Sequence, residues 1–140
     1  MIIGIGTDLL EIGRMARILE QASGERFLER VLTERERSLA AKRRGRIAEF
    51  AAGRFAAKEA VAKAFGCGIG RQLGFQDIEV LPDGCGKPVC RLSEAAWGRL
   101  GLDPAATVCH LSITHGETAA MAYAVVEHVG LQRPDFRIGT

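Results

Sequence analysis

The sequence predicts an α+β fold, in which helices dominate the first half of the chain and an antiparallel sheet dominates the second. Three observations carry this prediction. Apolar residues recur at helical spacing through much of residues 11–65, runs of strand composition fill most of residues 75–128, and the turn Pro82-Asp83-Gly84 separates two of those runs. The length of 140 residues is typical of one domain.

The first half is expected to open with a strand and continue through helices. An apolar run with two glycines favours a strand over residues 1–7. Thr33 and Glu36 have the spacing of a capping box, which predicts that a helix begins there. Gly66 is suited to end the longest helix, because glycine tolerates the left-handed conformation found at helix C-termini. This longest helix is expected at residues 47–65, and two shorter ones at residues 11–21 and 25–31.

The second half is expected to be a set of antiparallel strands with one short helix. Ser93 is a suitable N-cap for a helix over residues 93–100. The last two strands are joined by four residues and are predicted to form a hairpin. A loose tail is expected from residue 131 onwards. The strands are predicted at residues 75–81, 87–92, 107–114 and 119–128.

Composition narrows the class of protein. Hydrophobic residues make up 47% and charged residues 26%, as in globular proteins, which excludes a disordered chain. The net charge of +2 is too small for a generic polyanion binder. The start lacks a basic segment typical of a signal peptide, and no run of 18 uncharged apolar residues predicts a membrane span. The cysteines form no C-x-x-C pair, so free thiols in a reducing cytoplasm are expected; they are Cys67, Cys85, Cys90 and Cys109.

Three charged residues on the long helix are candidates for function. Arg54 falls within the apolar stripe, and Glu59 and Lys63 lie one turn apart among small and apolar neighbours. This pattern predicts a helix that is covered on more than one side. Simpler interpretations are an exposed ion pair between Glu59 and Lys63, and an Arg54 side chain that lies along apolar surface with its head in water.

Asp8 follows the apolar run at the N-terminus. It either caps the helix that begins at residue 11 or belongs to a binding site at the end of the strand. If Asp8 and Glu59 meet in space, the two carboxylates suit Mg²⁺, which typically binds one or two carboxylates together with phosphate oxygens of a substrate. Lys63 would then be placed to contact a phosphate.

Two later segments are weaker candidates. The glycine-rich residues 66–71 either terminate the helix or offer backbone amides to an anion. On the strand over residues 107–114, His110, Ser112 and Thr114 share one face, which suggests a polar cleft. A structural role for His110 and a Ser112–His110 catalytic pair are alternatives, although no nucleophile elbow accompanies the serine.

Basic residues gather in two places. The first group lies in the early helices around Phe27, with acidic residues between its members; it contains Arg14, Arg17, Arg26 and Arg30. It is either a solvated charged face or a docking surface for an acidic partner, with Phe27 and Met15 as apolar anchors. The second group, residues 42–46, could contact phosphates or nucleic acid, but the small net charge and the single Trp and Tyr disfavour a nucleic-acid partner.

These residues resemble the bacterial holo-acyl-carrier-protein synthase family. The most specific block runs from Gly53 to Ala60 and continues to Lys63-Ala64-Phe65-Gly66. The other matching segments are Gly4-Ile5-Gly6-Thr7-Asp8, Phe27 to Glu36, Gly68-Ile69-Gly70, Phe75 to Val80, Gly86-Lys87-Pro88 and His110 to His115. The resemblance covers residues 1 to about 128, so residues 1–129 are assigned to a phosphopantetheinyl transferase domain and residues 130–140 to a C-terminal tail.

The resemblance implies a long central helix packed on a mainly antiparallel sheet, and an enzyme that moves 4′-phosphopantetheine from coenzyme A (CoA) to a serine of acyl carrier protein. It implies Mg²⁺ on Asp8 and Glu59, with Glu59 and Lys63 as catalytic residues. It also implies a cytoplasmic homotrimer that supports fatty acid biosynthesis, with active sites at subunit interfaces and no nucleic-acid or membrane partner. A non-catalytic module that binds CoA or the carrier protein is the alternative.

Further site residues follow from the same resemblance. CoA is expected to contact Arg54, Lys63, Gly66, His110, Ser112 and Thr114. The acidic carrier protein is expected to dock on Arg14, Arg17, Arg26 and Phe27.

Overall fold

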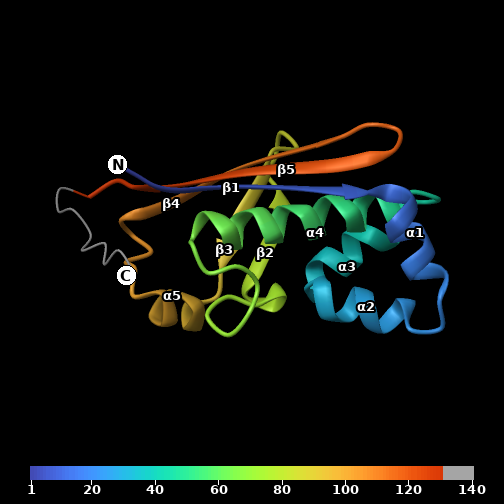
Figure 1. Cartoon of the computed structure of the whole chain (residues 1–140), viewed down its shortest axis with the longest axis horizontal. Helices are drawn as coiled ribbons and strands as arrows, with labels where there is room; N and C mark the ends of the chain where they lie inside the picture. The colour runs from blue at the N-terminus through green and yellow to red at the C-terminus, as the bar shows by residue number, and fades with distance from the viewer. Residues whose placement is uncertain (131–140) are drawn as a thin grey trace.

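A long helix packed under a three-stranded sheet forms the centre of the fold (Figure 1). The computed structural model describes residues 1–130, and the predicted tail from residue 131 onwards lies outside them. The sheet has the order β1-β5-β4 and is antiparallel throughout. Its strands are β1 (Ile2–Glu11), β4 (Thr107–His115) and β5 (Ala119–His128), and the helix is α4 (Ile47–Ala64). The predicted α+β class is confirmed.

Helix α4 is buried around most of its circumference, as its sequence predicted. Twelve of its 18 residues are buried. The sheet covers one side of α4, and the helices α1 (Ile12–Glu20), α2 (Gly24–Val31) and α3 (Glu34–Ala41) lie beside its N-terminal half (Figure 1). The burial therefore arises within one chain and does not depend on a neighbouring subunit.

Two glycines let β1 approach α4 closely. Gly4 and Gly6 point toward the helix, and a Cβ added at either position would overlap a backbone carbonyl of Ala64 or Ala60. Because residues of one strand alternate between its two faces, Asp8 points to the same side as these glycines. The glycines thus bring Asp8 against the last turns of α4.

A buried ion pair connects α3 with α4. The capping box at Thr33 is formed as predicted, and its Glu36 also pairs with Lys58 of α4 at 2.6 Å. Both side chains are fully buried. Sequence spacing alone did not point to this pair, because Glu36 and Lys58 lie on different helices.

The remaining elements form a second layer beside α4. A short 3-10 turn, η1 (Phe75–Asp77), leads into the hairpin of β2 (Ile78–Pro82) and β3 (Pro88–Leu92), which is followed by α5 (Glu94–Leu100). Ser93 caps α5 through its side chain, as predicted. The first strand of the hairpin begins three residues later than expected because residues 75–77 form the turn. Within residues 1–130 no helix is long and apolar enough to span a membrane.

Candidate active site

Asp8, Glu59 and Lys63 come together where β1 crosses the C-terminal half of α4. Lys63 Nζ lies 3.1 Å from Asp8 Oδ1 and donates a second hydrogen bond to the carbonyl oxygen of Thr7 at 3.0 Å. Within residues 1–130, Lys63 pairs with Asp8 and forms no ion pair with Glu59. The simple interpretation of Glu59 and Lys63 as an ion pair along one helix is therefore wrong.

Asp8 does not cap the first helix. Strand β1 extends to Glu11, so Asp8 lies inside the strand, and the N-cap of α1 is Glu11, whose side chain makes no capping hydrogen bond. The strand is longer than predicted because residues 4–11 all pair with β5. This pairing holds Asp8 rigidly beside α4.

Glu59 lies half-buried beside Asp8. Its pKa is raised above the ordinary value, first because burial disfavours the charged carboxylate and second because the negative charge of Asp8 is close; the charge of Lys63 opposes the shift. Two carboxylates that repel each other in a partly dehydrated site favour a bound cation.

The donor set at this site suits Mg²⁺. Asp8 and Glu59 provide two carboxylates, and Mg²⁺ usually takes one or two together with phosphate oxygens and water. Among residues 1–130, no group of three or more His, Cys, Asp or Glu side chains could form a closed protein cage for a metal. The site is therefore an open one that would leave coordination positions for a substrate.

Arg54 lies in a different place, on the side of α4 that faces β2. At 3.6 residues per turn, Arg54 and Lys63 are separated by about 180° around the helix axis. The side chain of Arg54 is 9% exposed, and its Nε donates a hydrogen bond to the carbonyl oxygen of Val80 at 3.0 Å. The guanidinium stacks over the Phe50 ring at 4.5 Å. The interpretation with the charged head in water is therefore wrong.

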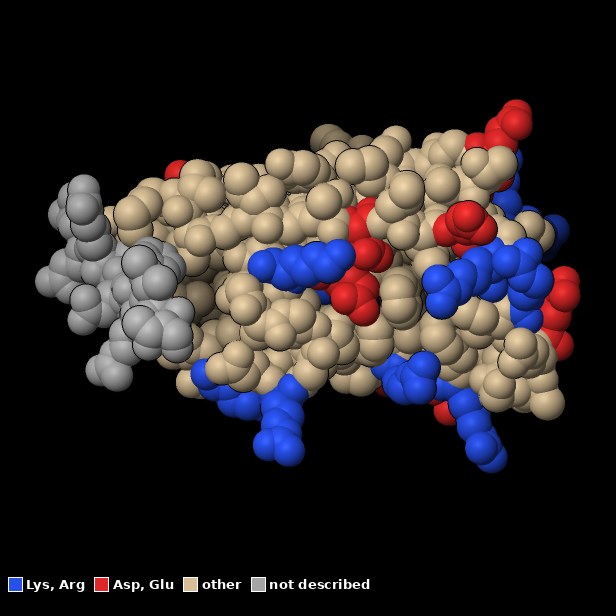
Figure 2. All heavy atoms as spheres, in the orientation of Figure 1, with Lys and Arg blue, Asp and Glu red and all other residues tan. Residues whose placement is uncertain are grey.

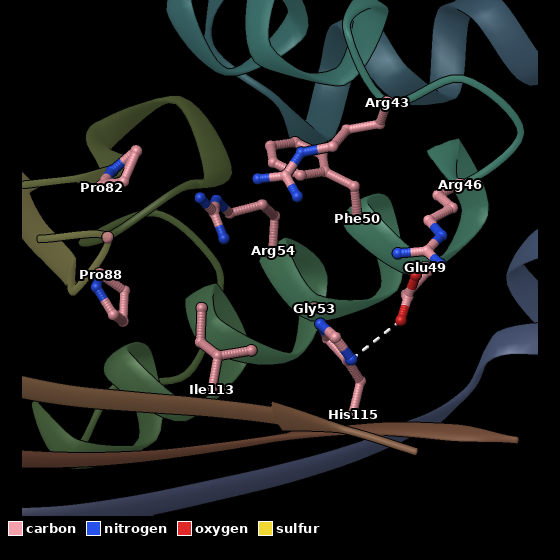
Figure 3. A pocket seen from close by; sticks show the side chains of 11 residues that line it. Arg43, Arg46, Glu49, Phe50, Gly53, Arg54, Pro82, Pro88, Ile113 and His115 are labelled. Carbon is pink, nitrogen blue, oxygen red and sulfur yellow. Dashed lines mark ion pairs between the residues drawn. The ribbon is translucent and has the colours of Figure 1, made fainter. Parts of the chain in front are cut away.

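A basic cavity of about 210 Å³ opens in front of Arg54 (Figure 3). Arg43 reaches toward the same Phe50 ring, at 5.4 Å, and Arg46 lies at the rim. His115 Nδ1 lies 2.8 Å from Glu49 Oε1 along the opposite wall. Backbone and proline rings of the β2–β3 hairpin, including Gly86 and Pro88, close the third side. One buried arginine, Arg54, and two exposed arginines, Arg43 and Arg46, line the same cavity, which favours an anionic ligand.

The polar face of β4 points away from α4. His110, Ser112 and Thr114 are exposed on the outer side of the sheet, as the predicted alternation required. His110 Nε2 lies 2.9 Å from Glu127 Oε2 of β5, so His110 is partnered by an acid and not by Ser112. His110 and Ser112 line a shallow cavity of about 450 Å³ together with Tyr123 and Lys87.

Gly66 ends α4 in the predicted way. Its φ is +82°, and its N–H donates to the carbonyl oxygen of Lys63. The amides of Cys67 and Gly68 donate to the carbonyl of Ala62. These amides complete the helix terminus and are not free to bind an anion. Any contact of Gly66 with CoA would therefore use its Cα or its carbonyl oxygen and not its N–H.

The predicted docking residues lie at one end of the molecule. Basic side chains gather over α1 and α2, with acidic side chains between them (Figure 2). Arg14, Arg17 and Arg26 are exposed. Phe27 is half-buried and stacks on Phe55, with ring centroids 6.2 Å apart. Met15 is fully buried and cannot anchor a partner, because its side chain fills the core between α1 and α4.

The predicted residues therefore form separate groups within one chain. Asp8, Glu59 and Lys63 meet at β1, Arg54 faces the hairpin, and the β4 residues lie on the outer face of the sheet. Sequence reasoning did not assign His115 or Glu49 to a site. His115 is the last residue of the segment His110 to His115 that resembles the family, but only the fold places it in the same cavity as Arg54.

Comparisons with known proteins agree on one family. Residues 4–124 match the model of the family described as the 4′-phosphopantetheinyl transferase superfamily. A holo-[acyl-carrier-protein] synthase of Bacillus cereus (strain B4264) is 44% identical over 128 residues, which are 91% of this chain and 97% of that protein. A crystal structure of a holo-(acyl-carrier-protein) synthase from Bacillus anthracis str. Ames, in complex with CoA (3′,5′-ADP), is 43% identical with a TM-score of 0.77 and covers 91% of this chain and 98% of its own. The holo-[acyl-carrier-protein] synthase structure from Neisseria meningitidis is 34% identical with a TM-score of 0.80, over 91% of this chain and 99% of its own.

Proposed function

The chain belongs to the holo-[acyl-carrier-protein] synthase family of 4′-phosphopantetheinyl transferases and is a transferase, and from this premise we propose its reaction in detail. It transfers the 4′-phosphopantetheine group from CoA to a serine hydroxyl of apo-acyl carrier protein. The products are holo-acyl carrier protein and adenosine 3′,5′-bisphosphate. The reaction depends on Mg²⁺ and supports fatty acid biosynthesis in the cytoplasm.

The observation that carries this proposal is the meeting of Asp8, Glu59 and Lys63. Their proximity requires the close approach of β1 to α4 that Gly4 and Gly6 permit. Two acids and a lysine, half open to solvent, suit a substrate pyrophosphate and its cation better than they suit a structural ion pair. Mg²⁺ bound by Asp8 and Glu59 would offset the charge that develops on the leaving bisphosphate.

The side chains of the chain itself supply the remaining chemistry. Lys63 already carries its ammonium at the site and stabilises the same developing charge on phosphate oxygens. The serine oxygen of the carrier forms the new bond to phosphorus as the bond to the bisphosphate breaks. We assign Glu59 to accept the serine proton, through a carboxylate oxygen that the cation would leave free.

CoA is a long molecule, so we expect it to contact more than one of the three groups of site residues described above. We assign its phosphorylated nucleoside end to the basic cavity of Arg54 and to the β4 residues His110, Ser112 and Thr114. These residues and the Asp8 site lie on different sides of α4 and of the sheet, so a complete site requires residues from neighbouring copies.

The outer face of the sheet supports a homotrimer. It exposes large apolar side chains, including Leu9 at 67% and Ile5 at 57%, next to Tyr123. Exposed apolar patches of this kind are typical of interfaces. Light scattering is expected to give a mass of about 45 kDa, three times the 15.1 kDa chain; a concentration-independent mass of one chain would contradict the shared site.

The carrier protein docks on the exposed arginines Arg14, Arg17 and Arg26, with Phe27 beside them. Their positive charges complement an acidic recognition helix and accelerate encounter. Residues 1–129 form the catalytic domain in this proposal, and residues 130–140 form a tail.

The test is a mass measurement. Apo-acyl carrier protein incubated with CoA and Mg²⁺ is expected to gain the mass of one phosphopantetheine when the chain is present. Glu59→Ala is expected to abolish the gain, whereas Glu94→Ala, at an exposed acid on α5, leaves it intact. No gain with the unmodified chain would refute the activity, and full activity of Glu59→Ala would refute the site.

A further inference from the structure

A buried acid lies behind the cavity of Arg54. The Oε1 atom of Glu36 accepts hydrogen bonds from Lys58 Nζ at 2.6 Å and from the Thr33 amide at 2.8 Å. Lys58 also donates to the carbonyl oxygens of Val31 and Phe75. All donors of this ammonium are used, so the pair is fully satisfied although no water reaches it.

The second oxygen of Glu36 reaches a different element. Glu36 Oε2 accepts a hydrogen bond from the amide of Val80 in β2 at 2.9 Å. The carbonyl oxygen of the same Val80 accepts the hydrogen bond from Arg54 Nε at 3.0 Å. Val80 of β2 therefore connects the two side chains: its amide donates to Glu36, and its carbonyl oxygen accepts from Arg54.

The guanidinium of Arg54 has few other constraints. Nε is bound by Val80, and the group rests on the Phe50 ring, which fixes its plane and not its direction. Burial lowers the pKa of Arg54, and the negative charge of Glu36 opposes part of that shift. The free edge of the guanidinium faces the cavity shown in Figure 3.

A buried ion pair is a poor means of stabilising a core, because apolar residues of similar volume often do as well or better. The connection through Val80 offers a different reason for this one. We propose that Glu36 is a positioning residue, which fixes the backbone of Val80 through its amide and thereby aims Arg54, bound to the Val80 carbonyl, at the 3′-phosphate of CoA. This inference rests on the proposed function, in which Arg54 contacts the phosphorylated nucleoside.

The experiment measures discrimination between CoA and 3′-dephospho-CoA, as the ratio of their kcat/KM values. The double variant Glu36→Leu with Lys58→Met removes both charges together and takes away the acceptor for Val80. We expect the discrimination to fall about tenfold in this variant, which is the effect of losing one well-aligned charged hydrogen bond. The change is expected in KM for CoA, with little change in kcat.

A rescue variant separates positioning from packing. Glu36→Gln with Lys58→Met keeps an amide oxygen that can accept from Val80, and we expect it to recover most of the discrimination. Thr33→Val is the control for general destabilisation: it breaks the hydrogen bond of the Thr33 hydroxyl to Glu79 and its cap on the Glu36 amide, but it leaves the Glu36 carboxylate on Val80 and does not touch Arg54. It is expected to unfold at lower temperature and to discriminate as the unmodified chain does.

The outcomes are distinct. Wild-type discrimination in the folded Leu/Met variant would overturn the inference while the transferase proposal stands. If that variant does not fold, Glu36→Asp serves instead, since it keeps the buried charge but is one methylene short of Val80; wild-type discrimination in it has the same meaning. Absence of any transfer by the unmodified chain would instead overturn the proposed function.

Discussion

Substituting Gly6 by alanine tests whether the contact between β1 and α4 builds the site. The added Cβ would overlap the carbonyl oxygen of Ala60 and lie 2.8 Å from the Ala64 amide nitrogen. Ordinary contacts begin at 3.4 Å, so the contact with the Ala64 nitrogen alone needs a retreat of about 0.6 Å, and the closer overlap with the Ala60 oxygen makes the retreat of β1 larger than that. Catalytic constellations tolerate displacements of about 0.5 Å.

The retreat carries Asp8 with it, because Asp8 is two residues further along the same face. We expect Gly6→Ala to lower the free energy of unfolding by about 1–3 kcal/mol, as overpacking usually does. We also expect weaker Mg²⁺ binding, measured by isothermal titration calorimetry, and a reduced kcat in the transfer assay.

Gly13→Ala is the matched control for this experiment. A Cβ at position 13 would meet only the end of the Arg17 side chain, at an ordinary 3.6 Å. Since Gly13 lies in α1, alanine there is expected to stabilise the helix by roughly 0.5–1 kcal/mol and to leave the site unchanged. Equal Mg²⁺ affinity in the two variants would refute the reasoning.

Three further predictions concern charge. The carboxyl pKa of Glu59, followed by NMR, is expected to fall toward its ordinary value in Asp8→Asn; an unchanged pKa would show that the two carboxylates do not interact. Because the folded pKa exceeds the unfolded one, the stability from this group is present at low pH and lost as the pH rises through the folded pKa. Lys58→Met alone is expected to cost about 3–5 kcal/mol in urea unfolding, since it leaves the Glu36 charge buried without a counter-ion, and the double variant with Glu36→Leu to recover part of that loss, because leucine removes the charge but leaves the Thr33 and Val80 amides without their acceptor; equal losses would argue against a desolvated pair. Arg14→Glu is expected to weaken carrier binding in a salt-dependent way without changing KM for CoA, and salt-independent affinity would reject the docking surface.

Local signals in the sequence predicted most elements of the fold. The Thr33 capping box, the Ser93 cap, Gly66 at the end of α4 and the last hairpin depend on neighbours within a few residues, and all are found. Strand β1 was underestimated because its length is set by pairing with β5, more than 100 residues away. The residues of β1 alone therefore could not predict where the strand ends.

The candidate site divides in the same way. Helical spacing showed that Arg54 and Glu59 were unusual for an apolar helix and lie on different sides of it, but not which element each of them faces. Lys63 pairs with Asp8 across 55 residues, and Lys58 with Glu36 across 22. Such contacts depend on how elements dock, so only the three-dimensional structure could assign partners to these charges.

The pairing of β1 with β5 also sets the order in which the protein can mature. Ile2 pairs with Glu127, and the N-terminal ammonium donates to the carbonyl of His128, so the first strand completes its ladder with a strand that is synthesised more than 100 residues later. Contacts of such large sequence separation form slowly. Asp8 is made before any other residue of the site, yet it is fixed beside Glu59 only after β5 has left the ribosome. A nascent or truncated chain that lacks β5 therefore contains α4 with its glutamate and lysine but cannot form the proposed Mg²⁺ site, so in this proposal activity appears only when folding is complete.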